Sequence, residues 1–379
     1  MKGLPVEIVL YTPERKDQLA ELHSHFWGDA SVSAAYLEWK YGNNPNPGTS
    51  RIYLALGDGR PVGMRGIYGA MMEAGSPPRK FLGLHADDLV IAPDCRSRGV
   101  VSTIMRAAFD DLRGKGWDYV FSVSAGEITR LSSLAAGWRH VGKVGELRRG
   151  SRRVDRLRRL HDKMSGMRFF HRYADRVRSR LERHLRSDLR GRRAKGPIKV
   201  GPRVFLRQEP LPEEMARLVE RVPYDGRIRH VRDKAYFSWR FRNPIHKYWF
   251  LFWEEKELEG YLILQEYLPE VLVRSVTNIV DWEASDERVR AGLLQAALRL
   301  GHFPDLRIWG ATLPADARSL LENSGFRPCV GDSGIADPQK CILVKPLEEG
   351  IPENDRMLAG RRVLDIADWD IRMAYSMHG

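Results

Sequence analysis

Hydrophobic and polar positions along the chain form two patterns that alternate. Short apolar runs of strand length are followed by longer stretches in which apolar residues recur every three or four positions, as on one face of a helix. In the first part of the chain the pattern predicts strands at 52–57, 89–92 and 119–125 and helices at 15–28 and 100–116. Residues 200–347 show the same alternation. The sequence therefore predicts mixed α/β layers in both parts of the chain.

The two α/β parts also repeat the same motifs in the same order. The stretches YLEWKYGNNP at 36–45 and YFSWRFRNP at 236–244 both contain Trp, a basic residue, an aromatic residue and then Asn-Pro. The stretches RLSSLAAGWRHVG at 130–142 and RSLLENSGFRPC at 318–329 are both short helical segments that end at Gly and continue with an aromatic residue. Because such self-similarity indicates an internal repeat, we interpret the chain as a tandem duplication of one fold.

The positive charge is concentrated between the two halves. The 379 residues include 62 Lys and Arg and 49 Asp and Glu, which gives a formal net charge of +13. Residues 148–195 alone hold 19 basic and 5 acidic residues, and the remainder holds 43 basic and 44 acidic residues. The same segment carries apolar residues at spacings of three or four from Leu157 to Leu189. This pattern predicts a basic amphipathic helical insert.

Three interpretations of the insert stay open. It is a helical connector if its apolar stripe packs on the domains and its arginines stay solvated. It is a peripheral contact with an anionic membrane surface if residues 148–195 adsorb to acidic lipid, as basic amphipathic helices do. Nucleic acid is the least favoured partner, because the segment lacks the stacking aromatics of an RNA-binding motif. We therefore expect no nucleic-acid partner.

Length indicates the number of domains, and the apolar runs and cysteines indicate the compartment. A chain of 379 residues is longer than one hydrophobic core serves well, which favours two domains. It has no run of 18 apolar residues, and its first residues lack the layout of a signal peptide. Cys95, Cys329 and Cys341 form no CxxC pair and have no histidines at ligand spacing. We expect a cytoplasmic protein that binds no metal.

Residues 87–116 contain the most informative junction. The apolar run LVIA predicts a central strand, and Pro93 must end its pairing because proline cannot continue the hydrogen-bond ladder. An amphipathic helix follows, with Val101, Ile104, Met105 and Ala108 on its inner face. The turn between them holds arginines and Gly99. Unpaired N–H groups at a helix N-terminus, its dipole and a glycine form an anion site, so the expected ligand carries a phosphate.

Two common phosphate-binding fingerprints are missing from this turn. A dinucleotide site would require GxGxxG, and an ATP site of the P-loop type would require GxxxxGK[ST]. The turn instead reads Arg96-Ser-Arg-Gly99-Val-Val101. It resembles motif A of the GNAT superfamily of acyl-CoA N-acyltransferases, Gln/Arg-x-x-Gly-x-Gly/Ala, at the Arg and at the first Gly. Val101 departs from the small final residue of that motif.

The resemblance implies a fold and a donor. Residues 85–142 follow the GNAT order of strand, loop, helix, strand and helix, and the strand at 119–125 corresponds to the fifth strand, which splays from the fourth to admit the pantetheine arm. The implied donor is acyl-CoA, either acetyl-CoA or a longer acyl chain. The resemblance assigns its binding to Leu89, Val90, Ile91, Arg96, Ser97, Arg98, Gly99, Val100, Val101 and Ser102.

The second half resembles a GNAT domain that has lost its donor site. Where motif A would lie, it reads NIVDWEASDERVRAGLLQAAL, with no Gly in the turn and with Glu283 and Asp286 where the pyrophosphate would bind. We therefore expect one acyl-CoA site per chain. The predicted organisation is a GNAT-like domain with the acyl-CoA site (1–147), the insert (148–199), a degenerate GNAT-like domain (200–347) and a C-terminal extension (348–379).

Further features resemble a tandem GNAT subgroup, some of whose members act on amino sugars of nucleotide-sugar and surface-polysaccharide pathways. These features are YLEWKY with its following Asn-Pro, Asp88 five residues before Pro93, and WRFRNP in the second half. The resemblance implies transfer of an acyl group to a primary amine of a small molecule, such as an amino sugar or a nucleotide-linked amino sugar.

N-acylation requires a polarised thioester carbonyl, a deprotonated amine and a protonated leaving thiolate. The resemblance assigns the first task to a backbone N–H near Val90 and Ile91. Candidates for the base are Asp87, Asp88, His85 and Glu127, of which we favour Asp88 and Glu127 because both lie at the mouth of a splayed strand. Ser133 stands where GNAT enzymes often have a Tyr acid, and it could hold the thiolate through water. Residues expected to contact the acceptor are Trp39, Tyr41, Asn43, Asn44 and His85.

Two other functions remain as alternatives. An aminoacyl-tRNA-dependent ligase of the Fem type also has tandem GNAT-like halves, but it needs no intact CoA loop, so Arg96 and Gly99 argue against it. A non-catalytic GNAT-like module docked on membrane by the insert is favoured if Ser133 means that the chemistry is lost.

Overall fold

The computed structural model describes residues 4–151, 196–267, 276–329, 340–348 and 356–376, with residues 350 and 352. The chain forms two compact units that are not contiguous in sequence. Unit 1 comprises Met1–Val144, Tyr224–Pro244 and Pro338–Asp370, and unit 2 comprises Gly145–Pro223, Ile245–Asp337 and Ile371–Gly379. Most of the predicted insert, from 152 to 195, lies outside the described residues, so its predicted helices and stripe are not tested.

Unit 1 is built on an eight-stranded mixed sheet of order β1-β2-β3-β4-β5-β16-β6, with β10 paired to β3. Its strands are β1 (Glu7–Leu10), β2 (Arg51–Gly57), β3 (Arg60–Ala74), β4 (Arg79–Ile91), β5 (Tyr119–Ala125), β6 (Arg139–Lys143), β10 (Arg229–His230) and β16 (Cys341–Pro346). Its helices are α1 (Lys16–Trp27), α2 (Ala30–Leu37), the π-helical turn η2 (Glu38–Gly42), α3 (Val100–Leu112), α4 (Glu127–Ala135) and α8 (Lys234–Arg240). A small hairpin adds β17 (Met357–Leu358) and β18 (Arg361–Arg362).

Unit 2 has a second eight-stranded sheet, of order β15-β7-β14-β13-β12-β11-β9-β8. Its strands are β7 (Glu146–Gly150), β8 (Ile198–Lys199), β9 (Val204–Arg207), β11 (His246–Glu254), β12 (Leu258–Tyr267), β13 (Thr277–Ala284), β14 (Asp305–Trp309) and β15 (Arg327–Pro328). Its helices are α7 (Pro212–Arg221), α9 (Glu287–Arg299) and α10 (Ala315–Asn323). The mixed α/β fold class and the tandem arrangement are confirmed.

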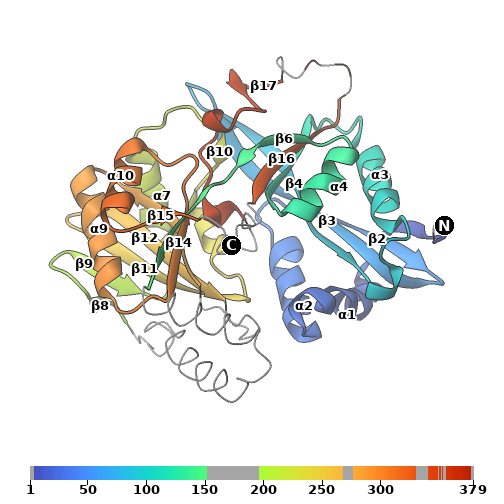
Figure 1. Ribbon diagram of the computed structural model, residues 1–379, viewed down its shortest axis with the longest axis horizontal. Helices are drawn as coiled ribbons and strands as arrows, with labels where there is room; N and C mark the ends of the chain where they lie inside the picture. The colour runs from blue at the N-terminus through green and yellow to red at the C-terminus, as the bar shows by residue number, and fades with distance from the viewer. Residues whose placement is uncertain are drawn as a thin grey trace, which may run out of the picture. The chain divides into compact units, whose positions relative to one another are not determined.

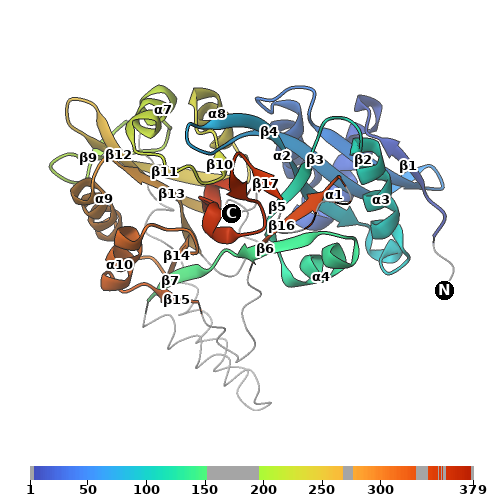
Figure 2. The same ribbon diagram turned by 90° about the horizontal axis from the view of Figure 1, so that it is seen from above.

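The two halves of the chain exchange strands. β7 follows β6 in sequence but pairs with β14 and β15 of unit 2. In return, β16 comes from the second half of the chain and pairs with both β5 and β6 of unit 1. Figure 2 shows β16 in orange-red among the blue and green elements of unit 1. Each sheet is therefore completed by a strand from the other half, an arrangement that the contiguous predicted limits do not include.

The helices of unit 1 cover both faces of its sheet, with α3 and α4 on one side of β2, β3 and β4 and α1 and α2 on the other (Figure 1). The alternation of side chains along β3 explains this division. A Cβ at Gly63 would touch Val100 and Ile104 of α3, whereas a Cβ at Gly66 would collide with Tyr41, which follows α2. Side chains at odd positions of β3, such as 63, thus face α3, and those at even positions, such as 66, face the layer that contains Tyr41.

Part of the second half also packs into unit 1. The indoles of Trp39 and Trp239 stack with their centroids 5.1 Å apart. Each indole donates a 2.8 Å hydrogen bond to the backbone carbonyl of the other Trp. The two copies of the repeated Trp-basic-aromatic motif therefore contact each other reciprocally.

Some element limits differ from the predicted ones. The helix predicted to reach residue 116 ends at Leu112, because Gly114 and Gly116 adopt positive φ angles that end it. Residues 148–150, predicted to begin the insert, belong to strand β7.

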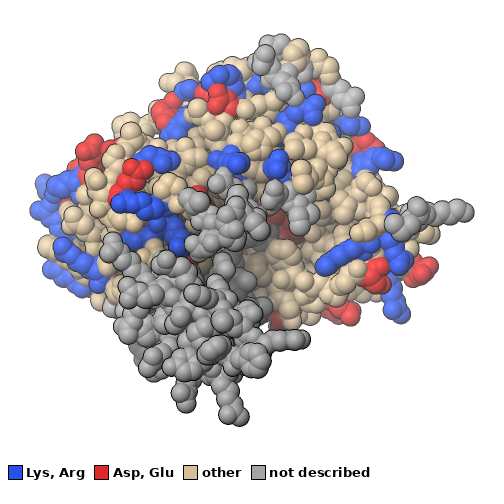
Figure 3. Space-filling model, in the orientation of Figure 1, with Lys and Arg blue, Asp and Glu red and all other residues tan. Residues whose placement is uncertain are grey.

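None of the described helices has the length and the apolar composition that a membrane crossing requires. On the face drawn in Figure 3, basic and acidic side chains are interspersed over the described surface.

We predict that each sheet depends on its exchanged strand. Leu343 on β16 is fully buried in unit 1, and Leu147 on β7 is almost fully buried in unit 2. Leu343→Ala should lower the opening free energy of unit 1 by about 2–5 kcal/mol, because it leaves a cavity in that core. Hydrogen exchange should show lost protection in β4, β5 and α3. Leu147→Ala is the matched control, which should affect β13 and β14 instead; equal effects on both units in either variant would contradict the prediction.

Candidate active site

The turn before α3 has the geometry of an anion site. β4 ends at Ile91, so its pairing stops before Pro93 as predicted, and Pro93 begins a short 3₁₀ turn. Gly99 is the N-cap of α3, with a φ of 80°, and no side chain caps the helix there. By contrast, α9 of unit 2 is capped by Asp286, whose carboxylate accepts from the backbone N–H of Val289. The first turn of α3 thus keeps N–H groups for an external anion.

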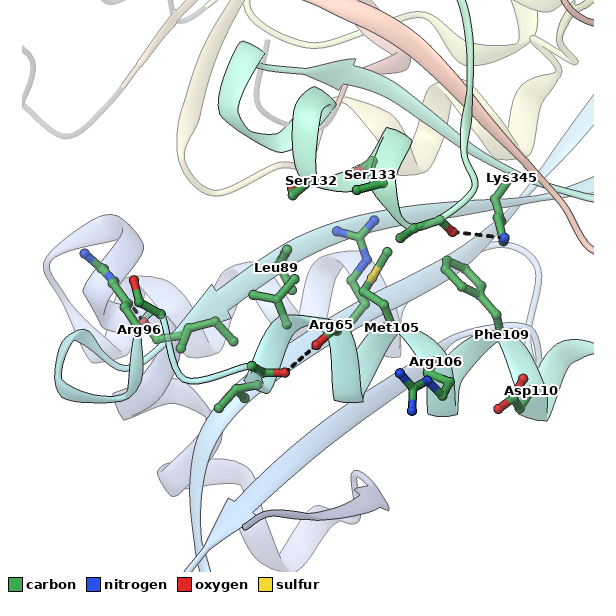
Figure 4. Close-up of a pocket in the computed structure, with 18 of the residues that line it drawn as sticks. Arg65, Leu89, Arg96, Met105, Arg106, Phe109, Asp110, Ser132, Ser133 and Lys345 are labelled. Carbon is green, nitrogen blue, oxygen red and sulfur yellow. Dashed lines mark hydrogen bonds between the residues drawn. The ribbon is translucent and has the colours of Figure 1, made fainter. Parts of the chain in front are cut away.

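A pocket of about 710 Å³ lies beside this turn, between β4, α3 and α4 (Figure 4). Its lining includes the end of β4, the loop at 95–99, one face of α3 and the facing side of α4. Of the residues predicted to bind the donor, those that line it are Leu89, Ile91, Arg96, Ser97, Gly99, Val100, Val101 and Ser102. Val90 and Arg98 do not line it.

The pocket lining is strongly basic. Its cationic residues are Arg65, Arg96, Arg106, Arg113 and Lys345, and its acidic residue is Asp110. Lys345 lies on the exchanged strand β16, and its Nζ donates to the carbonyl of Ala136 at 3.0 Å. A residue from the end of the chain therefore completes a pocket formed by the first half. An uncapped helix N-terminus and a basic lining fit the phosphates of CoA.

Strands β4 and β5 diverge at the pocket. They pair only at Leu84 with Val120 and at His85 with Phe121, and β5 then continues with β16. The splay expected for this strand pair is therefore present. β4 also has a bulge beside the splay, where Asp88 and Leu89 oppose Arg65 alone on β3. Asp88 has a φ of 50°, which is unusual for a residue with a side chain.

The bulge is fixed by a buried lysine. Lys40 has a fully buried side chain, and its Nζ donates to Asp87 and to Asp88, each at 2.7 Å. It also donates to the hydroxyl of Tyr36 at 3.0 Å and lies 5.2–5.5 Å from three tyrosine ring centroids. Tyr41 donates to Asp88 at 2.5 Å. The favoured base Asp88 is thus held by two donors, with a side chain only 1% exposed, whereas that of Asp87 is 23% exposed.

The residues predicted to contact the acceptor take different positions. Trp39 is occupied by its stack on Trp239, and Tyr41 by its bond to Asp88. Asn44 is buried and accepts from the backbone N–H of Asn46, whereas Asn43 is exposed. Trp39, Tyr41 and Asn44 therefore shape the structure around η2.

His85 lies in an aromatic cluster. Its ring stacks on Tyr68 at 5.3 Å and meets His230 edge-on at 4.8 Å. Burial is the main cause that lowers the pKa of His85 to about 3. Burial also lowers the pKa of His230 well below its usual value. Both imidazoles are therefore neutral at physiological pH, and His85 is a weak candidate for the base.

The remaining predicted catalytic residues lie on α4. Ser133 is buried and lines the pocket beside Ser132. Its backbone carbonyl accepts from Ala136 and Trp138. Glu127 is the first residue of α4, and its side chain lies outside the described part. Its role as a base stays a prediction. No group of three or more His, Cys, Asp or Glu that could hold a metal ion occurs among the described residues.

The corresponding region of unit 2 is occupied by the protein itself. Arg372 donates to Asp281 at 2.7 Å and to Glu283 at 2.9 Å, and both carboxylates are buried. Asp281 adjoins a bulge of β13, where Val280 has no partner on β12, whereas Asp88 belongs to the bulge of β4 itself. With Asp286 capping α9, these contacts leave little to attract a phosphate.

Comparison with known proteins finds a family model that matches part of the first half. Residues 16–127 match the model of the Acetyltransferase (GNAT) family. This part of the chain therefore has the sequence features of a GNAT acetyltransferase family domain. No curated protein matches the sequence. The GNAT resemblance is thus confirmed for the first half, whereas the amino-sugar subgroup stays a prediction.

Solved structures extend the fold similarity to both units. A GCN5-related N-acetyltransferase from Anabaena variabilis matches with a TM-score of 0.56 and 11% identity, over 91% of this chain and 73% of that chain. A tandem GNAT protein from the clavulanic acid biosynthesis pathway matches with a TM-score of 0.52 and 12% identity, over 92% of this chain and all of that chain. Eis1 from Mycobacterium abscessus matches with a TM-score of 0.50 and 12% identity, over 91% and 74%. At these identities the matches establish the fold.

Sequence reasoning missed several charged residues of the site, including Lys40, Arg65, Arg106, Arg113 and Lys345. Lys40 lies in the repeated Trp-basic-aromatic motif, and its place before Tyr41 was a signal that could have found it. Arg65 and Lys345 carried no such signal, since one lies within a strand pattern and the other lies 209 residues from its partner Ala136. Only the strand order places Lys345 at the pocket.

We predict that the Lys40 network is required for stability. Lys40→Met should lower the free energy of unfolding by about 3–5 kcal/mol, because it leaves buried carboxylates without their counter-charge. Asp88→Asn should also destabilise, and the double variant should lose less than the sum, as measured by urea unfolding in a double-mutant cycle. Lys16→Met removes an exposed pair to Glu38 and should cost less than about 1 kcal/mol. Additive losses for Lys40 and Asp88 would contradict the coupling.

We predict a pH dependence of stability from His85. Its folded pKa of about 3 is below the unfolded value of about 6.5, so the unfolded chain binds the extra proton between these values. Stability is therefore highest above pH 6.5 and falls as the pH is lowered. Between pH 7 and pH 5, His85→Phe should lose roughly 2 kcal/mol less unfolding free energy than the wild type. The same loss in both proteins would show that His85 does not titrate in this way.

Proposed function

We propose that the protein is an acyl-CoA-dependent N-acyltransferase that transfers an acyl group to a primary amine of a small molecule. The observation that carries the proposal is the uncapped N-terminus of α3 at the end of a basic pocket. The GNAT-family match over residues 16–127 supports the same chemistry. The donor could be acetyl-CoA or a thioester with a longer acyl chain.

The donor would lie along the pocket with its phosphates at the loop. The N–H groups of the first turn of α3 and the guanidinium of Arg96 would hold the pyrophosphate, since both attract anions. The pantetheine arm would pass Ile91 and Leu89 toward the gap between β4 and β5. A backbone N–H at the bulge of β4 would polarise the thioester carbonyl, because a bulged residue lacks a ladder partner.

Asp87 is better placed than Asp88 to take the proton of the amine. Both belong to the bulge, but the Asp88 side chain is almost fully buried and held by Lys40 and Tyr41. Asp87 keeps 23% of its side chain exposed while Lys40 and the backbone N–H of Asp88 orient it. Asp88 would then act as a positioning residue. Ser133, which lines the pocket, would hold the leaving thiolate through water, or the thiolate would leave without a side-chain acid.

The proposal also includes an acceptor class and a location for the protein. An amino sugar or a nucleotide-linked amino sugar is the acceptor class that the sequence resemblance implies. Attachment to an anionic membrane through residues 148–195 stays a prediction, because residues 152–195 lie outside the described part. The Fem-type ligase is disfavoured because the described pocket keeps Arg96 and the free helix N-terminus, which such an enzyme does not need.

Two neighbouring positions on α3 allow a matched test of the donor site. The hydroxyls of Ser102 and Thr103 both donate to the carbonyl of Gly99, and both side chains are exposed, but only Ser102 lines the pocket. Glu at either position should suit the first turn of the helix. Ser102→Glu should weaken acetyl-CoA binding more than 10-fold by repelling the phosphates, and Thr103→Glu should change it less than about 3-fold. Isothermal titration calorimetry measures both.

Native mass spectrometry with acetyl-CoA should show one donor per chain in the wild type. With a panel of primary amines, release of the free CoA thiol should require both donor and amine. Two donors per chain, or equal affinities in the two Glu variants, would contradict the assigned site. Binding without amine-dependent thiol release by any amine would favour a non-catalytic module instead.

A further inference from the structure

Arg65 is a buried cation that lacks a partner in the described part of the chain. It lies on β3 opposite the bulge of β4, and only 4% of it is exposed. Its Nε is buried with no hydrogen-bond partner, and no ion pair joins Arg65 to another described residue within 4.0 Å. Figure 4 shows the side chain rising from β3 across the pocket toward Ser133, beside Met105. The guanidinium is therefore directed into the donor pocket.

The surroundings of Arg65 make this arrangement costly. Leu89, Ile91 and Met105, which line the same pocket, are apolar. The carboxylates that act on the charge of Arg65 are those of Asp87 and Asp88, and both are paired with Lys40. A buried charge without a partner destabilises a fold, so its presence requires either a structural partner or a ligand that supplies one.

The position of Arg65 identifies which part of a donor it would contact. The phosphates belong at the loop after Ile91, where Arg96 and the N-terminus of α3 lie. Arg65 faces the bulge two residues earlier on β4, roughly 6–7 Å along the strand from Ile91. That is the level at which the thioester and its acyl group would lie. A neutral acyl chain would make only van der Waals contact with the guanidinium. A carboxylate would neutralise its charge and match its forked geometry.

We propose that Arg65 selects a donor whose acyl group ends in a carboxylate, so that the acyl donor is the CoA thioester of a dicarboxylic acid. This inference rests on the proposed function. Arg65 is then a specificity residue: it forms a bidentate ion pair with the acyl carboxylate and takes no part in proton transfer. The product would be an amide that carries a free carboxylate.

Succinyl-CoA and butyryl-CoA form a matched pair of probes, since their acyl chains have the same number of carbons and differ in the terminal group. The wild type should bind succinyl-CoA about 10- to 100-fold more tightly than butyryl-CoA, the range for a charged hydrogen-bonded pair. In Arg65→Met the preference should disappear through loss of succinyl-CoA affinity, while CoA itself binds as before. Arg65→Lys keeps the charge and should recover part of the preference.

Arg106→Met is the matched control, because Arg106 lines the same pocket one helical turn after Ser102. It should weaken both thioesters by the same factor and leave their ratio unchanged. Thermal unfolding of the free protein should show Arg65→Met as stable as the wild type or more so, because the substitution removes an unpaired buried charge.

The outcomes separate this inference from the proposed function. Equal affinity of the wild type for the two thioesters, or equal loss of CoA, butyryl-CoA and succinyl-CoA in Arg65→Met, would overturn the role of Arg65 and leave the donor site intact. A marked loss of thermal stability in Arg65→Met would show a structural role and overturn it as well. If neither thioester nor CoA binds to the wild type, the proposed function fails, and the inference fails with it.

Discussion

The pairing of β16 with β5 is the contact on which the donor pocket depends. A strand has two edges, and β5 uses one for β16 along most of its length while it keeps only two residue pairs with β4 on the other. Because β5 is held from the far side, it can diverge from β4 without losing its place in the sheet. The gap beside the bulge follows from this, and so does the position of Lys345 on the pocket wall. The exchanged strand β16 therefore both completes the sheet of unit 1 and contributes a residue to its pocket.

The bulges of β4 and β13 are similar in local structure, but only the one in β4 is followed by an uncapped helix N-terminus. In both halves a carboxylate at a bulge is neutralised by a cation from a distant part of the chain, which is Lys40 for Asp88 and Arg372 for Asp281. Arg372 also pairs with Glu283, and Asp286 caps the following helix, so that unit 2 satisfies its own charges and amides. In unit 1, Tyr41, the neighbour of Lys40, packs against Gly66 on the side of β3 opposite to Val100 and Ile104 of α3, and the turn after β4 is left uncapped. The difference explains why we assign the donor to the first half alone.

Buried cations are arranged in two ways within unit 1. Lys40 is surrounded by two carboxylates and three tyrosines, so its charge stabilises the bulge and its removal should be costly. Arg65, on the next strand, has no such partners among the described residues. One cation therefore serves the structure, whereas the other is retained at an energetic cost that a ligand can offset. Lys40 is therefore a structural cation, whereas Arg65 is the residue that we propose recognises the acyl group.

The sequence by itself determined the elements and the chemistry that neighbouring residues share. The strand, the stop at Pro93, the glycine turn and the amphipathic helix are local, because backbone geometry and side-chain periodicity fix them within about 30 residues, and they pointed to a phosphate site and to the GNAT fold. The repeated motifs likewise indicated the duplication. What only the tertiary structure decided was which strands pair and which charges meet. Nothing in a β-strand pattern says which edge it will join, so the exchange of β7 and β16, the contact of Lys40 with Asp88 across 48 positions and the isolation of Arg65 arise from packing between distant segments.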